Sequence, residues 1–144
     1  MPARIAALLA VILLLAPVST EAAETLSDGD RAAIRQVIQS QLDAFKRGDG
    51  AAAYGLASPE IQLKFGTPEN FMNMVKAAYP AVYRPKAVEF RELDSNDAMG
   101  VVQKVFFIGP DGSGVLAYYP MERQPDGSWK INGCFVTVVP DTSV

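Results

Sequence analysis

The sequence predicts an α+β fold, in which N-terminal helices pack on a strongly bent antiparallel sheet of about four strands. Apolar residues recur with a helical period up to residue 78 and with a period of two from residue 86 onward. Two similar turn signals, Pro110-Asp111-Gly112-Ser113 and Pro125-Asp126-Gly127-Ser128, separate the period-two segments. Pro at the second position and Gly at the left-handed position favour tight turns, so these segments should be antiparallel neighbours.

The clearest helix is expected over residues 28–47. Ser27 or Asp28 can cap its start, and Gly48 follows its last turn as the residue at which it ends. Its apolar face follows the spacing of one side of a helix. The residues on that face are Ile34, Val37, Ile38, Gln41, Leu42 and Phe45.

The helical segments that follow are short because each begins at its own cap signal. Asp49 can cap a turn that reaches Leu56. Ser58-Pro59-Glu60 begins a helix that ends near Lys64, and Thr67-Pro68-Glu69 begins another over residues 68–78. We expect an extended connector between Pro80 and Pro85.

Strands are expected over residues 88–91, 101–108, 115–123 and 129–139, with a turn at residues 94–97. On the two middle strands both faces are apolar, whereas a sheet with one wet face should alternate. Either the sheet curls around a core or its second face meets a partner chain. We favour a homodimer formed through that face.

The first 22 residues have the layout of a secretory signal peptide. Arg4 precedes the apolar run Ile5–Ala16, which is shorter than the roughly 20 residues that span a bilayer. Pro17 ends the run, and we expect cleavage after Ala22. The expected organisation is a signal peptide (1–22), a short leader (23–29) and one α+β domain (30–140). We expect the protein to be exported to a bacterial periplasm or secreted. After cleavage we expect no membrane association.

Composition removes several classes of chemistry. The chain has no His, one Cys and a net charge of −3. No Ser-His-Asp triad, Cys-His pair or imidazole metal site is available, and a nucleic-acid binder normally carries a basic footprint. We expect no catalytic residue, metal, cofactor or nucleic-acid partner. Cys134 is expected to be buried in the last strand, next to an Asn132-Gly133 bulge.

Aromatic residues supply the candidate ligand site. We expect an amphipathic pocket lined by Tyr54, Phe71, Tyr83, Tyr119 and Trp129. The alternative is that they are core and interface aromatics with one polar end. The carboxylates of the strand region, Glu89, Glu92 and Glu122, are expected at the surface.

Three segments carry a resemblance to a known family: AIRQVIQSQLDAFKRGDGAAAYGLASPEI, FGTPENFMNMV and ERQPDGSWKINGCFV. They resemble small exported bacterial domains of unknown function in the nuclear transport factor 2-like (cystatin-like cone) superfamily, over residues 30–140. The resemblance implies a bent sheet wrapped around helices, often with a pocket at the open end, and it agrees with a dimer. It leaves function open, because this fold hosts isomerases, cyclases, dehydratases and modules without activity.

Three hypotheses for function follow. The first is a non-catalytic exported module that binds a small apolar or amphipathic ligand or a partner protein. The second is an acid–base enzyme of the isomerase or cyclase type, which needs a buried carboxylate within reach of a Tyr. The third is a structural interaction domain whose interior is filled.

Overall fold

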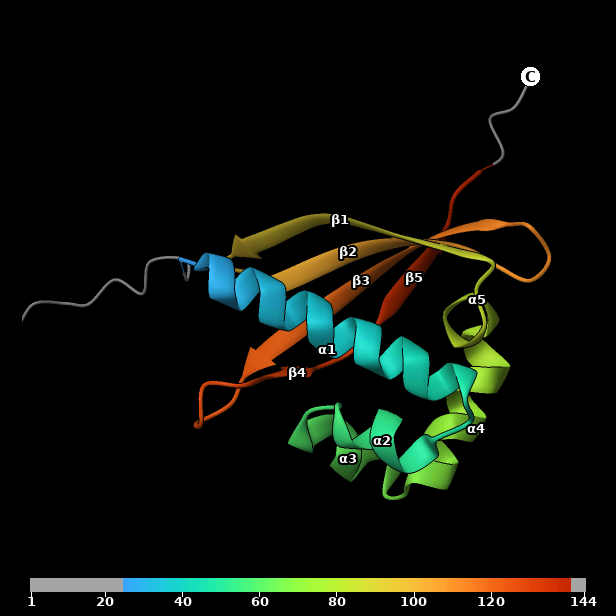
Figure 1. Cartoon of the computed structure of the whole chain (residues 1–144), viewed down its shortest axis with the longest axis horizontal. Helices are drawn as coiled ribbons and strands as arrows, with labels where there is room; N and C mark the ends of the chain where they lie inside the picture. Colours follow the sequence, from blue (N-terminus) through green and yellow to red (C-terminus); the bar gives the residue numbers. More distant parts are fainter. Residues whose placement is uncertain (1–24, 141–144) are drawn as a thin grey trace, which may run out of the picture.

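The computed structural model of this chain describes residues 25–140, and the predicted signal peptide lies outside the described residues. Five helices precede the sheet among the described residues: α1 (Asp28–Lys46), α2 (Gly50–Gly55), α3 (Pro59–Phe65), α4 (Pro68–Ala78) and α5 (Pro80–Tyr83). The strands are β1 (Ala87–Asn96), β2 (Gly100–Ile108), β3 (Gly114–Arg123), β4 (Trp129–Ile131) and β5 (Phe135–Val138) (Figure 1). The predicted α+β class is confirmed. None of the described helices has the length and apolar character needed to cross a membrane.

The cap signals act as the sequence predicts. Asp49, Ser58 and Thr67 each accept a hydrogen bond from a backbone N–H in the first turn of α2, α3 and α4. At α1, Ser27 and Asp30 bond reciprocally to each other's backbone N–H. Helices α1 to α4 therefore each begin where a side-chain cap satisfies a free N–H group, whereas α5 has no side-chain cap.

One connector prediction is wrong. Residues 80–85 were expected to be extended, but Pro80–Tyr83 forms the single turn α5. Pro80 occupies the first helical position, where its fixed φ favours a helix and its missing N–H costs nothing. Ala81 and Val82 are buried in the core, and this burial stabilises the turn.

The sheet has five antiparallel strands in the order β1-β2-β3-β4, with β5 also paired to β3. The predicted turn at residues 94–97 falls later, because β1 continues to Asn96. The side-chain oxygen of Asn96 accepts hydrogen bonds from the backbone N–H groups of Ala98 and Met99. This contact places the reversal just after Asn96.

The last predicted strand, 129–139, is split into β4 and β5. Both pieces pair with β3, β4 with its C-terminal end and β5 with its N-terminal end. Between these paired stretches, Tyr119 and Pro120 face the three residues 132–134, which we call the β4–β5 connection. The extra residue is a bulge that interrupts the strand.

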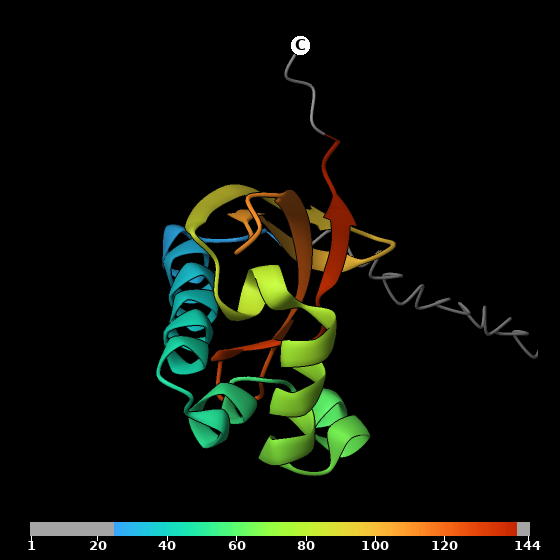
Figure 2. The ribbon, with the colours of Figure 1, turned by 90° about the vertical axis from the view of Figure 1, so that its right-hand side faces the viewer.

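Helix α1 lies across the inner face of the sheet, and α2, α3 and α4 gather beyond its C-terminal end (Figures 1 and 2). The described helices all lie on this one side of the sheet (Figure 2). The core therefore forms between α1 and alternate residues of β2 and β3. Its most completely buried members include Ile34, Ile38, Phe45, Val105, Phe107, Ala117 and Tyr119.

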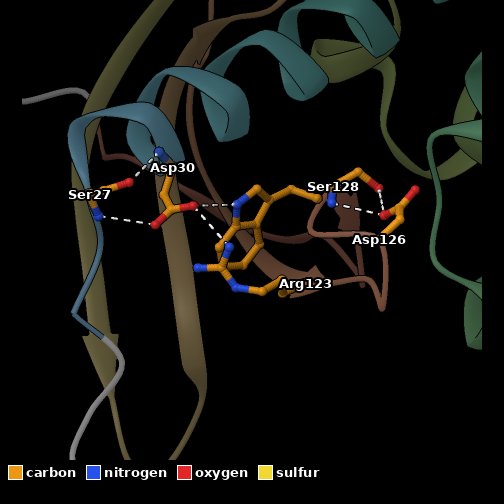
Figure 3. Close-up of polar contacts among 6 residues, drawn as sticks. Ser27, Asp30, Arg123, Asp126 and Ser128 are labelled. Carbon is orange, nitrogen blue, oxygen red and sulfur yellow. Dashed lines mark hydrogen bonds and ion pairs between the residues drawn. The ribbon is translucent and has the colours of Figure 1, made fainter.

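The carboxylate of Asp30 joins the start of α1 to the far end of the sheet (Figure 3). One oxygen accepts hydrogen bonds from the Arg123 guanidinium at 3.0 Å and from the Trp129 indole at 3.3 Å. The other accepts from the Ser27 backbone N–H at 3.0 Å. The Arg123 guanidinium also stacks 4.4 Å from the Trp129 ring centre. These bonds, that from Arg123 first and those from Ser27 next, hold the pKa of Asp30 well below its usual range.

We expect Asp30→Asn to destabilise the protein at neutral pH and to reduce the dependence of its stability on acid. The folded-state pKa of Asp30 lies below the usual 3.8, so its contribution is complete above that value and is lost as the pH falls further. The difference in melting temperature between wild type and variant, followed by circular dichroism, should therefore be constant above pH 3.8 and shrink progressively as the pH falls below it. Asp97→Asn, in the β1–β2 turn, is the matched control. A difference in melting temperature between wild type and Asp30→Asn that does not change with pH would contradict the lowered pKa of Asp30.

Candidate functional site

A cavity of about 750 Å³ lies between α3 and α4 on one side and the β4–β5 connection on the other. Part of its floor comes from α1 and β3. This volume falls within the range of sites that enclose small molecules. Most of the lining is apolar, including Phe45, Ile61, Phe65, Phe71, Val75 and Ile131.

Phe71 organises the aromatic wall of the cavity. Its ring centre lies 6.2 Å from that of Phe45, 5.8 Å from that of Tyr54 and 5.7 Å from that of Phe65. These separations are typical of tilted and edge-to-face aromatic pairs. The ring of Phe71 thereby ties α1, α2 and α3 to α4, and two of its partners line the cavity with it.

The β4–β5 connection forms the opposite wall and is held at two points. The Ser58 hydroxyl, at the start of α3, donates to the Asn132 side-chain oxygen at 2.7 Å. The Tyr79 hydroxyl, just after α4, donates to the Cys134 carbonyl at 3.1 Å. Between them Gly133 has φ 148°, in a region that favours glycine. The wall is therefore attached to α3 and to the end of α4, and the Asn132 N–H also bonds to the Pro120 carbonyl of β3 at 2.8 Å.

Tyr119 is the buried polar residue of this site. Its side chain is 1% exposed, and it lines the cavity from the centre of β3. Its hydroxyl has no hydrogen-bond partner among the described residues. Burial raises the pKa of Tyr119 well above its usual value, and the neighbouring Cys134 thiol, which is close enough to interact with the hydroxyl, raises it further. The hydroxyl therefore keeps the capacity to donate a strong hydrogen bond to an oxygen that reaches it.

Cys134 belongs to the cavity wall. The residue is half-buried and packs against the core. Burial raises the pKa of its thiol to about 12, so the group is a neutral thiol at physiological pH. A reactive cysteine needs an electropositive setting that stabilises the thiolate, and this site lacks that property.

The structure separates the five aromatic residues proposed for the pocket. Phe71 and Tyr119 line the cavity together. Tyr54 lies behind Phe71, where its hydroxyl donates to the Gln62 carbonyl. The other two lie elsewhere: Tyr83 contacts the Phe45 ring, and Trp129 is buried beside Asp30.

Sequence reasoning missed two contributions to the site. Gln41 was placed on the apolar face of the first helix, and Cys134 was placed as a buried residue of the last strand beside an Asn132-Gly133 bulge, neither of them in the pocket. Gln41 lines the cavity and donates its side-chain amide to the Ala53 carbonyl at 3.1 Å. An amide among apolar residues on a helix face is the signal that marked Gln41. The Asn132-Gly133 pair is the signal that marked the β4–β5 connection, which carries Cys134.

Charged groups are confined to the mouth. Glu60 and Lys64, both on α3, are the charged residues among those that line the cavity, and both are exposed. Over residues 25–140, no Asp or Glu is buried. The buried carboxylate that the acid–base hypothesis requires is therefore not among the described residues. The same residues contain no cluster of three His, Cys, Asp or Glu side chains suited to a metal ion.

Fold and site define a class: an α+β domain in which helices and an interrupted edge of the sheet enclose a cavity of ligand size. The chain belongs to the family described as a domain of unknown function (DUF4864), which matches residues 27–144. A comparison with curated proteins gave no match. A comparison with solved structures gave none either.

Two conservative substitutions should have opposite effects on stability. Tyr119→Phe removes a buried hydroxyl that has no protein partner, so we expect no loss and a gain of up to about 1 kcal/mol. Tyr54→Phe removes the bond to the Gln62 carbonyl and should cost about 1 kcal/mol. Urea unfolding followed by circular dichroism gives both values. Equal losses in the two variants would show that the Tyr119 hydroxyl is satisfied within the protein.

Proposed function

We propose that this domain binds a small, mostly apolar or amphipathic molecule in the cavity, without catalysing a reaction. The observation that carries the proposal is a partly open cavity of about 750 Å³ with an aromatic wall. Small-molecule sites are typically clefts of this size, lined mostly by apolar and aromatic side chains with a few polar groups.

The distribution of polarity indicates how such a ligand would lie. The depth of the cavity carries Phe45, Phe71 and Val75, whereas Glu60 and Lys64 stand at the mouth. Burial of the apolar body would supply most of the affinity. A polar end, where the ligand has one, would remain near the charged residues and water.

The setting we propose for this activity is extracytoplasmic. The support is the signal-peptide pattern of residues 1–22. The family match begins at residue 27, after the predicted cleavage site. We also propose membership of the nuclear transport factor 2-like superfamily, which the segments quoted above and the one-sided packing of the helices support.

Filling the cavity should abolish binding. Ala78 lines the cavity from the last turn of α4 and its surface is exposed, so a larger side chain can enter the space without displacing the core. Ala78→Trp should weaken binding of the neutral fluorescent probe N-phenylnaphthylamine by about tenfold or more. Probe fluorescence, which rises in apolar surroundings, measures the affinity.

Ala77→Trp is the matched control, because Ala77 is also exposed on α4 but does not line the cavity. It should bind the probe as wild type does. If wild type binds no probe, or if both tryptophan variants bind equally, the cavity is not a ligand site.

A second proposal concerns the outer face of the sheet. Strand pairing places Phe106 beside Leu116 on the face that the described helices leave uncovered, and both side chains are partly exposed. At its edge Phe135 is 59% exposed. We propose that a second copy of the chain covers this face, because apolar sheet faces of soluble proteins are usually covered.

Charge on this face should separate the two copies. We expect the wild-type protein to sediment as a dimer at micromolar concentration and Leu116→Lys to sediment as a monomer. Leu63→Lys is the control, because Leu63 is 84% exposed on α3, away from the sheet. A wild-type monomer at that concentration would refute the dimer.

A further inference from the structure

Tyr119 offers a feature that apolar binding alone does not explain. Its hydroxyl exposes less than 1 Å² and has no hydrogen-bond partner among the described residues. Buried hydroxyl groups in native proteins almost always have a partner. An unpaired one beside a large cavity is therefore a candidate contact for whatever occupies that cavity.

The Tyr119 ring cannot turn away to find another partner. The residue pairs with Gln103 of β2 and lies in the central strand of the sheet, where its side chain is 1% exposed. On the other side it faces the β4–β5 connection, which carries the Cys134 thiol. The hydroxyl is thus held in place, as an effective hydrogen-bond donor must be.

The surroundings of the hydroxyl favour a neutral ligand group. The charged side chains that line the cavity, Glu60 and Lys64, are exposed at its mouth. Tyr119 and Cys134 themselves remain uncharged at physiological pH, because burial raises the pKa of both. An anion at this depth would lose its hydration without gaining a cation, whereas a carbonyl oxygen needs only a donor.

Access to the Tyr119 hydroxyl depends on the Cys134 side chain in the wall beside it. Cys134 lies in the β4–β5 connection, outside both flanking strands, and follows Gly133. Because the Tyr119 hydroxyl exposes less than 1 Å², a ligand reaches it only if the Cys134 side chain changes rotamer, which breaks no backbone hydrogen bond of the sheet. The ligand oxygen would then meet the Tyr119 hydroxyl, with the thiol as a second, weaker donor.

We infer that the cavity selects ligands that carry an uncharged oxygen acceptor, such as a ketone or ester carbonyl, which accepts a hydrogen bond from the Tyr119 hydroxyl. This inference rests on the proposed binding function and adds the chemical class of the ligand. It identifies Tyr119 as a specificity-determining residue within an otherwise apolar site.

The test uses two probes of similar shape that differ in one group. Benzophenone has a carbonyl where diphenylmethane has a methylene, and each is measured by displacement of N-phenylnaphthylamine from the full mature chain. Wild type should prefer benzophenone. Tyr119→Phe should lower the affinity for benzophenone about fivefold and leave diphenylmethane unchanged or slightly improved. Diphenylacetate, the anionic probe, should bind more weakly than benzophenone.

Tyr118→Phe is the matched control, because Tyr118 lies on the same strand with its side chain on the opposite face of the sheet. It should change neither affinity, and circular dichroism of each variant confirms that it is folded. If Tyr119→Phe changes both neutral probes alike, or diphenylacetate binds as tightly as benzophenone, this inference is overturned while the binding function stands. If no probe binds to wild type, both proposals are wrong.

Discussion

The missing N–H of Pro120 is the constraint on which the candidate site depends. In an antiparallel strand the N–H and C=O of one residue point toward the same neighbouring strand. The Pro120 carbonyl accepts from the Asn132 N–H at 2.8 Å, so the side that faces the β4–β5 connection is also the side that lacks a donor. The regular pattern of backbone hydrogen bonds between the two strands is interrupted at Pro120. The connection therefore has one residue more than the stretch of β3 opposite it, which is a bulge. The absence of this single N–H on Pro120 thus divides the last strand into β4 and β5.

The helices turn this interruption into one wall of a cavity that is partly open to solvent. The bonds from Ser58 to Asn132 and from Tyr79 to Cys134 attach the connection to α3 and to the end of α4. Both helices are short because each starts at its own cap, and together they close the side of the cavity that the sheet leaves open. The cavity therefore follows from local signals in two distant segments and from their meeting in space.

The difference between local signals and contacts between distant segments explains what could be predicted from the sequence. Caps at Ser58 and Thr67 act within one turn, so the helix starts were predictable. Trp129 was assigned to the pocket because its type and position suit a ligand site. Its location is decided by Asp30, which lies 99 residues earlier in the chain. The Asn132-Gly133 signal indicated a bulge, but only the Pro120 carbonyl opposite shows that the bulge separates two strands. Long-range partners of single residues leave no trace in local periodicity.

Stability and binding are distributed to opposite ends of α1. At its N-terminus, Asp30 has donors from Ser27, Arg123 and Trp129, and this carboxylate joins helix and sheet. Beyond its C-terminus, the chain leaves an open volume beside the unpaired Tyr119 hydroxyl, and both features lower stability. A fold under selection for stability alone would fill that space and replace Tyr119 with Phe. Sites retained for function are where such departures from good packing are expected. The cavity end is therefore where we expect the activity of this domain.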